Sequence, residues 1–242
     1  MSITILSPAS LVPLVCKNCG SRLEGGDEAA IFVCPVCGIA YEAVEGDLVG
    51  FRPLTAAITT ELAVGGDVQY LAAWRSAVTA PPSLFAESAW ARISRAHAPD
   101  PVYLYVPAFT LVRAVVQRLA VSLAEAQPAL ELTPGLAQDT SRRPALVEAD
   151  KIPLPGSAGV ALTGPDFGTF SPVVVGRKDC PALAHFVFLA VESYELPNLR
   201  AVDYELEIAG AELVFLPAVW DPRYVHDSNW RLLLREFDGQ VA

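Results

Sequence analysis

Charged residues are scarce in this chain. Lysine, arginine, aspartate and glutamate make up 18% of its 242 residues, while 52% are hydrophobic; about 25% charged is typical of a soluble domain. Large apolar patches rarely stay exposed on a monomer. The composition therefore favours a chain that is partly covered by protein partners in a complex, or by further copies of itself.

Basic residues are fewer than acidic ones. Seventeen Lys and Arg residues face 27 Asp and Glu residues, which gives a net charge of −10. Binding of nucleic acid depends on clustered Lys and Arg side chains that neutralise phosphates. The charge balance therefore argues against nucleic acid as a partner.

Long hydrophobic runs are also missing. A transmembrane helix needs about 20 consecutive apolar residues, and the most apolar stretch, residues 102–126, is interrupted by Arg113, Gln117, Arg118 and Glu125. The first residues do not form a basic, apolar secretory signal. We expect a cytoplasmic protein that does not span a membrane, although docking to a membrane complex stays open.

Four of the five cysteines form two matched pairs, Cys16-Lys-Asn-Cys19-Gly and Cys34-Pro-Val-Cys37-Gly. Two closely spaced C-x-x-C pairs are typical of a site in which four thiolates hold one metal ion. Soft thiolate ligands in a tetrahedral shell select zinc or iron. The glycine after each pair suits a tight turn, because glycine tolerates positive φ. We therefore predict Cys16, Cys19, Cys34 and Cys37 as metal ligands.

The residues around the second pair predict a zinc ribbon. Apolar runs at 29–33, 39–44 and 48–52 have the length of short strands. Four ligands close the shell, which is the arrangement of a structural rather than a catalytic site. Zinc is the expected metal, and the alternative is a rubredoxin-like iron centre with the same ligands. Disulfides are disfavoured in a reducing cytoplasm, and redox-active C-x-x-C motifs normally occur singly with a βαβ pattern.

The remainder of the chain predicts a mixed α+β body. Apolar periodicity indicates helices at 83–96 and 110–126, and strands are expected at 68–75 and 102–106. The expected fold is a zinc ribbon over 1–52 and a body over 53–242, with antiparallel strands and about two main helices. A Gly- and Pro-containing segment predicts a further boundary near 135–144.

Residues 203–216 predict a β-hairpin. Asp203, Glu205 and Glu207 alternate with Tyr204, Leu206 and Ile208, which is the period of a strand with one acidic face. Ala209-Gly210 is then the expected turn before a returning strand.

Three aromatic motifs in the body share one pattern, and we predict that they end strands and that their aromatic side chains pack together. They are Tyr70-Leu-Ala-Ala-Trp74, Tyr105-Val-Pro-Ala-Phe109 and Phe215-Leu-Pro-Ala-Val-Trp220. The segments that overlap them are Tyr70-Leu71-Ala72-Ala73-Trp74-Arg75, Val106-Pro107-Ala108-Phe109 and Leu213-Val214-Phe215-Leu216-Pro217. With the four cysteines, they resemble a group of bacterial zinc-ribbon proteins in which a ribbon precedes a body with Tyr-Leu-Pro-aromatic-Trp-Arg strands. Ala72 departs from that pattern, which has proline there. The resemblance implies a ribbon and an α+β body, and no activity.

No catalytic motif is recognisable in the sequence. Phosphate-binding glycine loops, the G-x-S-x-G elbow and H-E-x-x-H are all missing. Asp221, His226 and Asp227 could line a hydrolytic or metal site, but their spacing matches no mechanism, and a loop is the simpler interpretation. Cys180 has no activating neighbour in the sequence, so we interpret it as an inert thiol.

The expected function is that of a non-enzymatic accessory subunit or adaptor in a larger cytoplasmic assembly. Two alternatives stay open: an electron-transfer component with an iron–thiolate centre, and a ligand-binding or enzymatic body.

Overall fold

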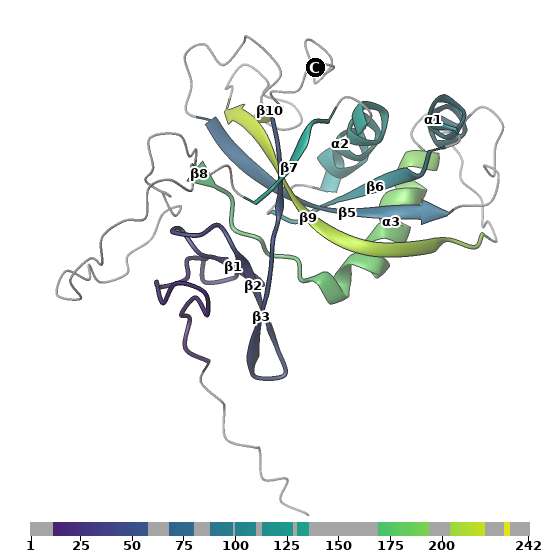
Figure 1. The fold of residues 1–242 in the computed structure, drawn as a ribbon. Helices are drawn as coiled ribbons and strands as arrows, with labels where there is room; N and C mark the ends of the chain where they lie inside the picture. The colour runs from purple at the N-terminus through teal and green to yellow at the C-terminus, as the bar shows by residue number, and fades with distance from the viewer. Residues whose placement is uncertain are drawn as a thin grey trace, which may run out of the picture.

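The computed structural model describes residues 12–57, 68–79, 88–98, 100–109, 113–127, 130–135, 169–193, 204–220 and 230–232. In these ranges a three-stranded antiparallel sheet precedes a larger sheet that is accompanied by three α-helices (Figure 1). The mixed α+β architecture with antiparallel strands is confirmed, with three helices where about two were expected. The division into domains at residue 52 stays a prediction, and most of the boundary expected near 135–144 lies outside the described residues.

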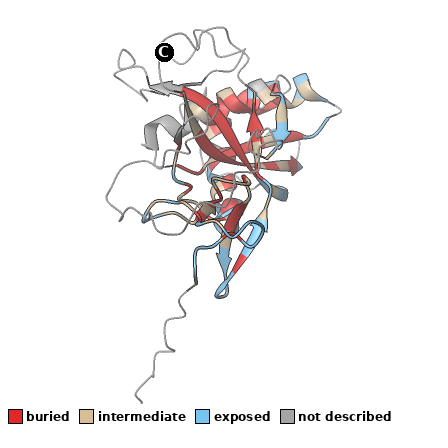
Figure 2. Ribbon diagram, turned by 60° about the vertical axis from the view of Figure 1, so that its left-hand side comes forward, coloured by how far each residue is buried: buried red, intermediate tan, exposed pale blue. Residues whose placement is uncertain are grey.

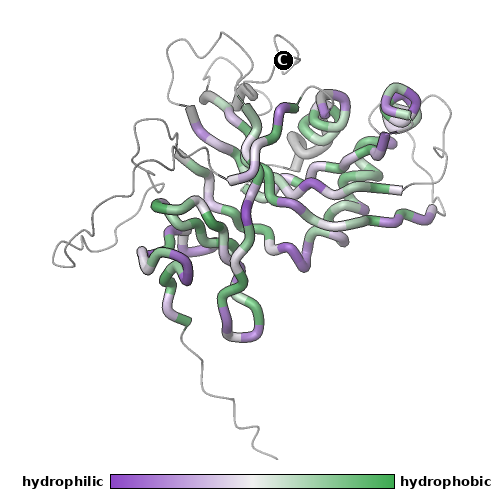
Figure 3. The backbone as a smooth tube through the Cα atoms, in the orientation of Figure 1, coloured by the Kyte–Doolittle hydropathy of each residue, from purple (hydrophilic) through white to green (hydrophobic). Residues whose placement is uncertain are grey.

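The small sheet consists of β1 (Ile31–Val33), β2 (Ala40–Val44) and β3 (Asp47–Phe51), in that order. Glu45 and Gly46 connect β2 to β3 with φ values of 50° and 86°. Positive φ at both positions is the turn geometry that fits the twist of a hairpin. The polar end of this hairpin projects away from the larger sheet (Figures 1 and 3).

The larger sheet has two long antiparallel strands at its centre, β5 and β9, with shorter strands on either side. Its path runs β6-β5-β9-β4-β7, and β8 and β10 add to β5 and β9. The strands are β4 (Leu54–Ala56), β5 (Val68–Thr79), β6 (Val102–Pro107), β7 (Leu132–Pro134), β8 (Thr169–Phe170), β9 (Glu207–Trp220) and β10 (Trp230–Leu232).

The prediction of a β-hairpin over residues 203–216 is wrong. β9 is one strand that pairs with β5 on both sides of Gly210, and the register shifts between Arg75 and Ala77. Gly210 has a φ of 65°, and Gly210 and Ala211 together oppose Ser76, which makes this pair a β-bulge. The strand period was identified correctly, but glycine with positive φ serves bulges and turns alike, and the sequence does not distinguish them.

The three helices are α1 (Ala89–His97), α2 (Arg113–Ala126) and α3 (Cys180–Glu192). α1 begins at Ser88, whose hydroxyl accepts a hydrogen bond from the Ala91 N–H at 3.1 Å. α1 and α2 correspond to the predicted helices. α3 was not predicted, because it is apolar on nearly all sides and lacks an amphipathic pattern. None of these helices has the length and hydropathy required to cross a membrane.

Both faces of the larger sheet are buried (Figure 2). On one face, Trp74 and Phe215 share a core with Trp90 of α1 and Phe188 of α3. On the other face, residues such as Leu71 and Val214 form a second core with Leu123 of α2. Trp74 of β5 and Val214 and Phe215 of β9 are all 0% exposed, so the two central strands are interior elements.

The aromatic motifs lie on the neighbouring strands β6, β5 and β9. Their predicted packing is confirmed for Tyr70, Trp74 and Phe215, which share one core, whereas Phe109 lies in the core on the other face. Phe170 stacks on Tyr70 with ring centroids 5.0 Å apart and meets Phe215 edge to face at 4.7 Å. β9 ends at Trp220, as predicted, whereas β5 continues past its motif to Thr79. Pro217 lies within β9 opposite Tyr70. The Tyr70 carbonyl accepts from Ser171 on the far side of β5. Pro217 therefore faces away from β5, and no bond between the two strands is lost.

The small sheet and the larger sheet share one core through residues 171–177, which we call the linking segment. The Val173 carbonyl accepts hydrogen bonds from the N–H groups of Ala30 (2.8 Å) and Ile31 (3.3 Å). The Trp74 indole N–H donates to the Val175 carbonyl at 2.8 Å. Ile31 belongs to the same buried cluster as Trp74 and Val173. One face of the small sheet is thus interior to the molecule.

Arg177 completes this junction. Its backbone N–H donates to the Glu42 carboxylate at 2.8 Å, and its guanidinium lies 4.3 Å from the ring centroid of Phe51 and 5.5 Å from that of Trp74. A guanidinium on aromatic faces contributes a cation–π attraction of about 1 kcal/mol.

The bulge at Gly210 generates a prediction about stability. An added Cβ would meet no atom within 4 Å, so the penalty of Gly210→Ala is that of the left-handed backbone alone, about 1 kcal/mol of unfolding free energy. Gly210→Asn should lose less, because asparagine tolerates this conformation. Urea denaturation of the three proteins measures the differences; equal losses for Ala and Asn would contradict the assignment of a strained bulge.

Candidate metal centre

The two C-x-x-C pairs form two turns, which we call knuckles, with the same hydrogen bonds. In the first knuckle, Cys16 N–H donates to the Ser21 carbonyl at 2.8 Å, and Gly20 N–H donates to the Cys16 carbonyl at 2.9 Å. In the second, Cys34 N–H donates to Ile39 at 2.8 Å, and Gly38 N–H to Cys34 at 2.9 Å.

Glycine is required at the same place in both knuckles. Gly20 has a φ of 76° and Gly38 a φ of 66°, values that side chains with a Cβ rarely adopt. The C-x-x-C-G spacing therefore encodes one local structure twice, and each copy turns two thiols toward the same side.

The knuckles bring the four sulfur atoms together. Cys16, Cys19, Cys34 and Cys37 place all their Sγ atoms within 4.8 Å of one another. The shortest separations, 3.4 Å, join Cys16 to Cys37 and Cys19 to Cys34, and all four are free thiols. Tetrahedral zinc with Zn–S bonds of about 2.3 Å separates its sulfurs by roughly 3.8 Å, so a cluster of this size could hold one metal ion.

The cluster lies at the centre of a small core of its own. Cys16 and Cys34 are buried with Leu23, Tyr41 and Leu48. Cys37 is partly buried, and Cys19 is exposed at the surface. The Tyr41 hydroxyl lies 3.2 Å from Cys16 Sγ. It is a hydrogen-bond donor to the sulfur, of the kind that orients a ligand and stabilises its thiolate.

The thiols of this cluster ionise unequally. Burial opposes ionisation of Cys16, but the hydrogen bond from Tyr41 and the backbone N–H groups of its knuckle lower its pKa to about 6. Burial raises the pKa values of Cys34 and Cys37. One buried thiolate is thus favoured and further ones are not, because like charges in contact repel. A cation between the sulfurs removes this penalty and ionises coordinating thiols.

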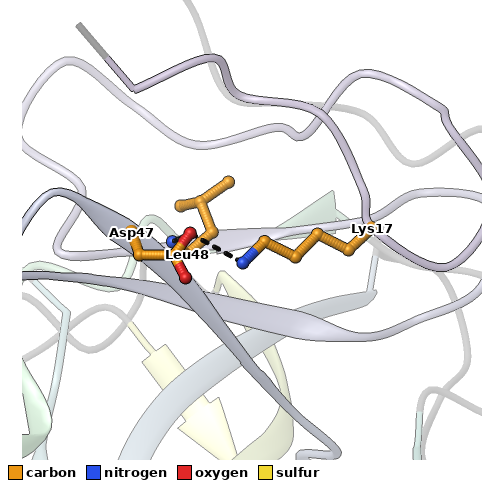
Figure 4. Close-up of polar contacts among 3 residues, drawn as sticks. All are labelled: Lys17, Asp47 and Leu48. Carbon is orange, nitrogen blue, oxygen red and sulfur yellow. Dashed lines mark hydrogen bonds and ion pairs between the residues drawn. The ribbon is translucent and has the colours of Figure 1, made fainter.

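A surface ion pair holds the first knuckle against the β2–β3 hairpin (Figure 4). Lys17 Nζ lies 2.7 Å from Asp47 Oδ1, and the same oxygen accepts from the Leu48 N–H at 2.8 Å. Both charged side chains are largely exposed, 54% for Lys17 and 74% for Asp47. Such pairs contribute little to stability, so the contact positions the two elements rather than holding the ribbon together.

The other predicted candidates lie elsewhere. Cys180 is buried at the start of α3, and its Sγ is 3.5 Å from Ser76 Oγ. Burial raises its pKa, which makes the thiol less reactive. Asp221, His226 and Asp227 lie outside the described residues.

Comparison with known proteins gives no relative. No protein-family model matches the chain, and no curated protein and no solved structure is significantly similar to it. The four-cysteine cluster supports the resemblance to bacterial zinc-ribbon proteins in that feature alone. The remainder of that resemblance stays a prediction.

Tyr41 is a member of the site that sequence reasoning missed. The pattern contained part of the information, because period-two alternation in β2 places Tyr41 and Ala43 on one face and Ala40 and Glu42 on the other. The missing step was to recognise that the face with Tyr41 points to the sulfurs.

The Tyr41 contact predicts a change in metal affinity. Tyr41→Phe removes the hydroxyl at Cys16 and keeps the ring in its core, so we expect roughly tenfold weaker metal binding with little change in fold. Competition with a chromophoric chelator measures the affinity. Tyr105→Phe, which removes a buried hydroxyl from the larger sheet, is the matched control. Equal affinities for both variants would show that the Tyr41 hydroxyl does not support the site.

Proposed function

We propose that the four cysteines bind a structural Zn²⁺ and that the protein is a non-enzymatic accessory subunit or adaptor within a larger cytoplasmic assembly. The observation that carries the metal proposal is the convergence of the four sulfurs from two identical knuckles. Four thiolates complete a tetrahedral shell and leave no position for substrate, which favours structure over catalysis.

Exposed apolar side chains support the proposal of a protein partner. Among the described residues, five large apolar side chains are exposed, and all but Phe186 belong to the ribbon: Leu14, Val15, Val44 and Val49. The linking segment covers only part of the small sheet's face that carries Glu42. Val44 and Val49 remain exposed on this same face, since Val49 is the cross-strand partner of Glu42. An apolar surface on a small metal module is the kind of surface that a permanent partner covers.

An iron centre is the second candidate. The exposed Cys19 thiol favours it, because electron transfer requires a short path from the surface to the metal. Iron uses the same four thiolates, and the geometry of the sulfurs suits both metals. Colour distinguishes them, since Zn²⁺ is d¹⁰ and its thiolate complexes are colourless, whereas iron–thiolate centres absorb visible light.

Removal of one ligand tests the metal proposal. Cys34→Ser should lose the bound metal and unfold the ribbon, because the binding free energy of a structural zinc, about 10–16 kcal/mol, is folding free energy for a small module. Elemental analysis and amide NMR spectra measure metal content and fold. Cys180→Ser is the matched control and should keep one zinc per chain.

Two results would contradict the metal proposal. One is a Cys34→Ser protein that keeps its metal. The other is a purified wild-type protein without metal, whose amide spectrum does not change when Zn²⁺ is added or when a chelator removes it. A coloured wild-type protein that contains iron would instead support the electron-transfer candidate.

Isolation from the native host tests the subunit proposal. A tagged chain expressed at its natural level should co-purify with a stoichiometric protein partner, identified by mass spectrometry, because its exposed apolar residues gather on the ribbon. Replacing Val44 and Val49 with serine should reduce recovery of the partner without loss of metal. A clean monomer with no partner would overturn the subunit proposal.

A further inference from the structure

The outer edge of β3 has backbone groups that no described residue pairs with. β3 is the last strand of the small sheet and pairs only with β2 among the described residues. The two-residue turn makes Val44 and Asp47 the closing pair, so the backbone groups of Leu48, Gly50 and Arg52 point away from β2. The Leu48 N–H is already bonded to Asp47. Among the described residues, the first backbone N–H on this edge without a partner is therefore that of Gly50.

A shallow groove of about 410 Å³ runs beside this edge. The first knuckle forms one wall with Lys17 and Asn18, and the β-sheet supplies the rest, including Tyr41, Gly50, Phe51 and Arg52. Gly50 leaves room for the Tyr41 ring in the floor of the groove, because an added Cβ there would come within 2.9 Å of that ring.

The groove is basic in an acidic protein. The net charge of the chain is −10, yet the charged side chains that line the groove are Lys17 and Arg52, and no carboxylate is among them. Asp47 already pairs with Lys17, and this exposed pair is of the weak kind that another carboxylate can replace.

Two kinds of surface meet at the edge. Alternation along β3 puts Gly50 on the face of Lys17 and the groove, and Arg52 continues on that face. Val49 points to the opposite face, where it is 47% exposed. A strand added to this edge would therefore meet basic groups with one set of side chains and an apolar side chain with the other.

We propose that the outer edge of β3 binds an extended segment of a partner protein in which acidic and apolar residues alternate. The segment adds to the small sheet as a further strand, with its backbone paired to Gly50 and Arg52. Its carboxylates lie near Lys17 and Arg52, and its apolar side chains cover Val49. This proposal deepens the accessory-subunit function and rests on it.

A designed peptide tests the edge directly. The probe is a fluorescently labelled peptide of about eight residues, the length of a strand, in which glutamate alternates with valine and threonine. Fluorescence anisotropy with the full metal-loaded chain should show saturable binding that weakens with added salt. The same peptide with lysine in place of glutamate should not bind, and neither should one with N-methyl groups on the pairing amides.

Charge variants test the assigned residues. Arg52→Glu should weaken binding by roughly tenfold or more, whereas Lys178→Glu, an equal change of charge at an exposed site outside the groove, should change it less than about twofold. Asp47→Asn should strengthen binding, because it releases Lys17 and keeps the oxygen that accepts from Leu48. Arg52→Gln replaces Arg52→Glu if the charge reversal disturbs the fold.

The outcomes separate this proposal from the one on which it rests. It is overturned if the acidic peptide shows no saturable binding, if the lysine or N-methylated peptide binds as tightly, or if the edge instead joins two copies in a dimer that Arg52→Glu dissociates. A chain with one zinc and a stoichiometric partner but no peptide binding would refute the groove alone. A chain without metal or partner would refute the proposed function.

Discussion

The ribbon depends on what occupies the space between four sulfur atoms. Thiols within 4.8 Å of one another gain little as neutral neighbours, and burial disfavours ionisation of Cys34 and Cys37. The fully buried core around them consists of two cysteines with Leu23, Tyr41 and Leu48. So small a core rarely stabilises a module alone. A metal bound by all four thiolates would supply the missing free energy and determine how the knuckles meet.

Stability gained at the metal centre would extend into the body. The face of the small sheet that points away from the sulfurs carries Ala40, which belongs to the same core as Trp74 and Val173. Glu42 on that face accepts a hydrogen bond from Arg177. An unfolded ribbon would therefore remove neighbours from the body's interior. Metal loading and packing of the body are coupled in this arrangement, even though the two sheets are separate in their hydrogen bonding.

Local signals in the sequence were sufficient where structure depends on local chemistry. The C-x-x-C-G spacing identified a cluster of four thiols because each knuckle is determined within six residues by its own hydrogen bonds. α2 was predicted correctly because one of its sides is polar, which makes its helical periodicity visible in the sequence. α3 was missed because its environment is apolar nearly all round. The bulge at Gly210 was mistaken for a turn because only the partner strand β5 shows whether the chain reverses.

The contacts of Tyr41, Glu42 and Arg177 were beyond prediction for a different reason. Each contact joins residues that are far apart in the sequence. A single sequence does not indicate which of its polar residues will come into contact in the fold. The same limitation applies to the edge of β3. Its residues form an ordinary short strand in the sequence, and only the fold shows that the first knuckle lies beside them.

The ribbon's surfaces differ in a way that bears on function. Its inner face packs on the body, and its centre holds the sulfurs. The outer edge of β3, beside Lys17 and Arg52, pairs with no other strand in the described part of the chain. Exposed strand edges invite non-specific pairing, and proteins usually protect them with charge or short length. Here the flanking charges are both basic and the protein is acidic, so copies of the chain repel one another while an acidic strand is attracted. The same charges that limit self-association would thus select the partner.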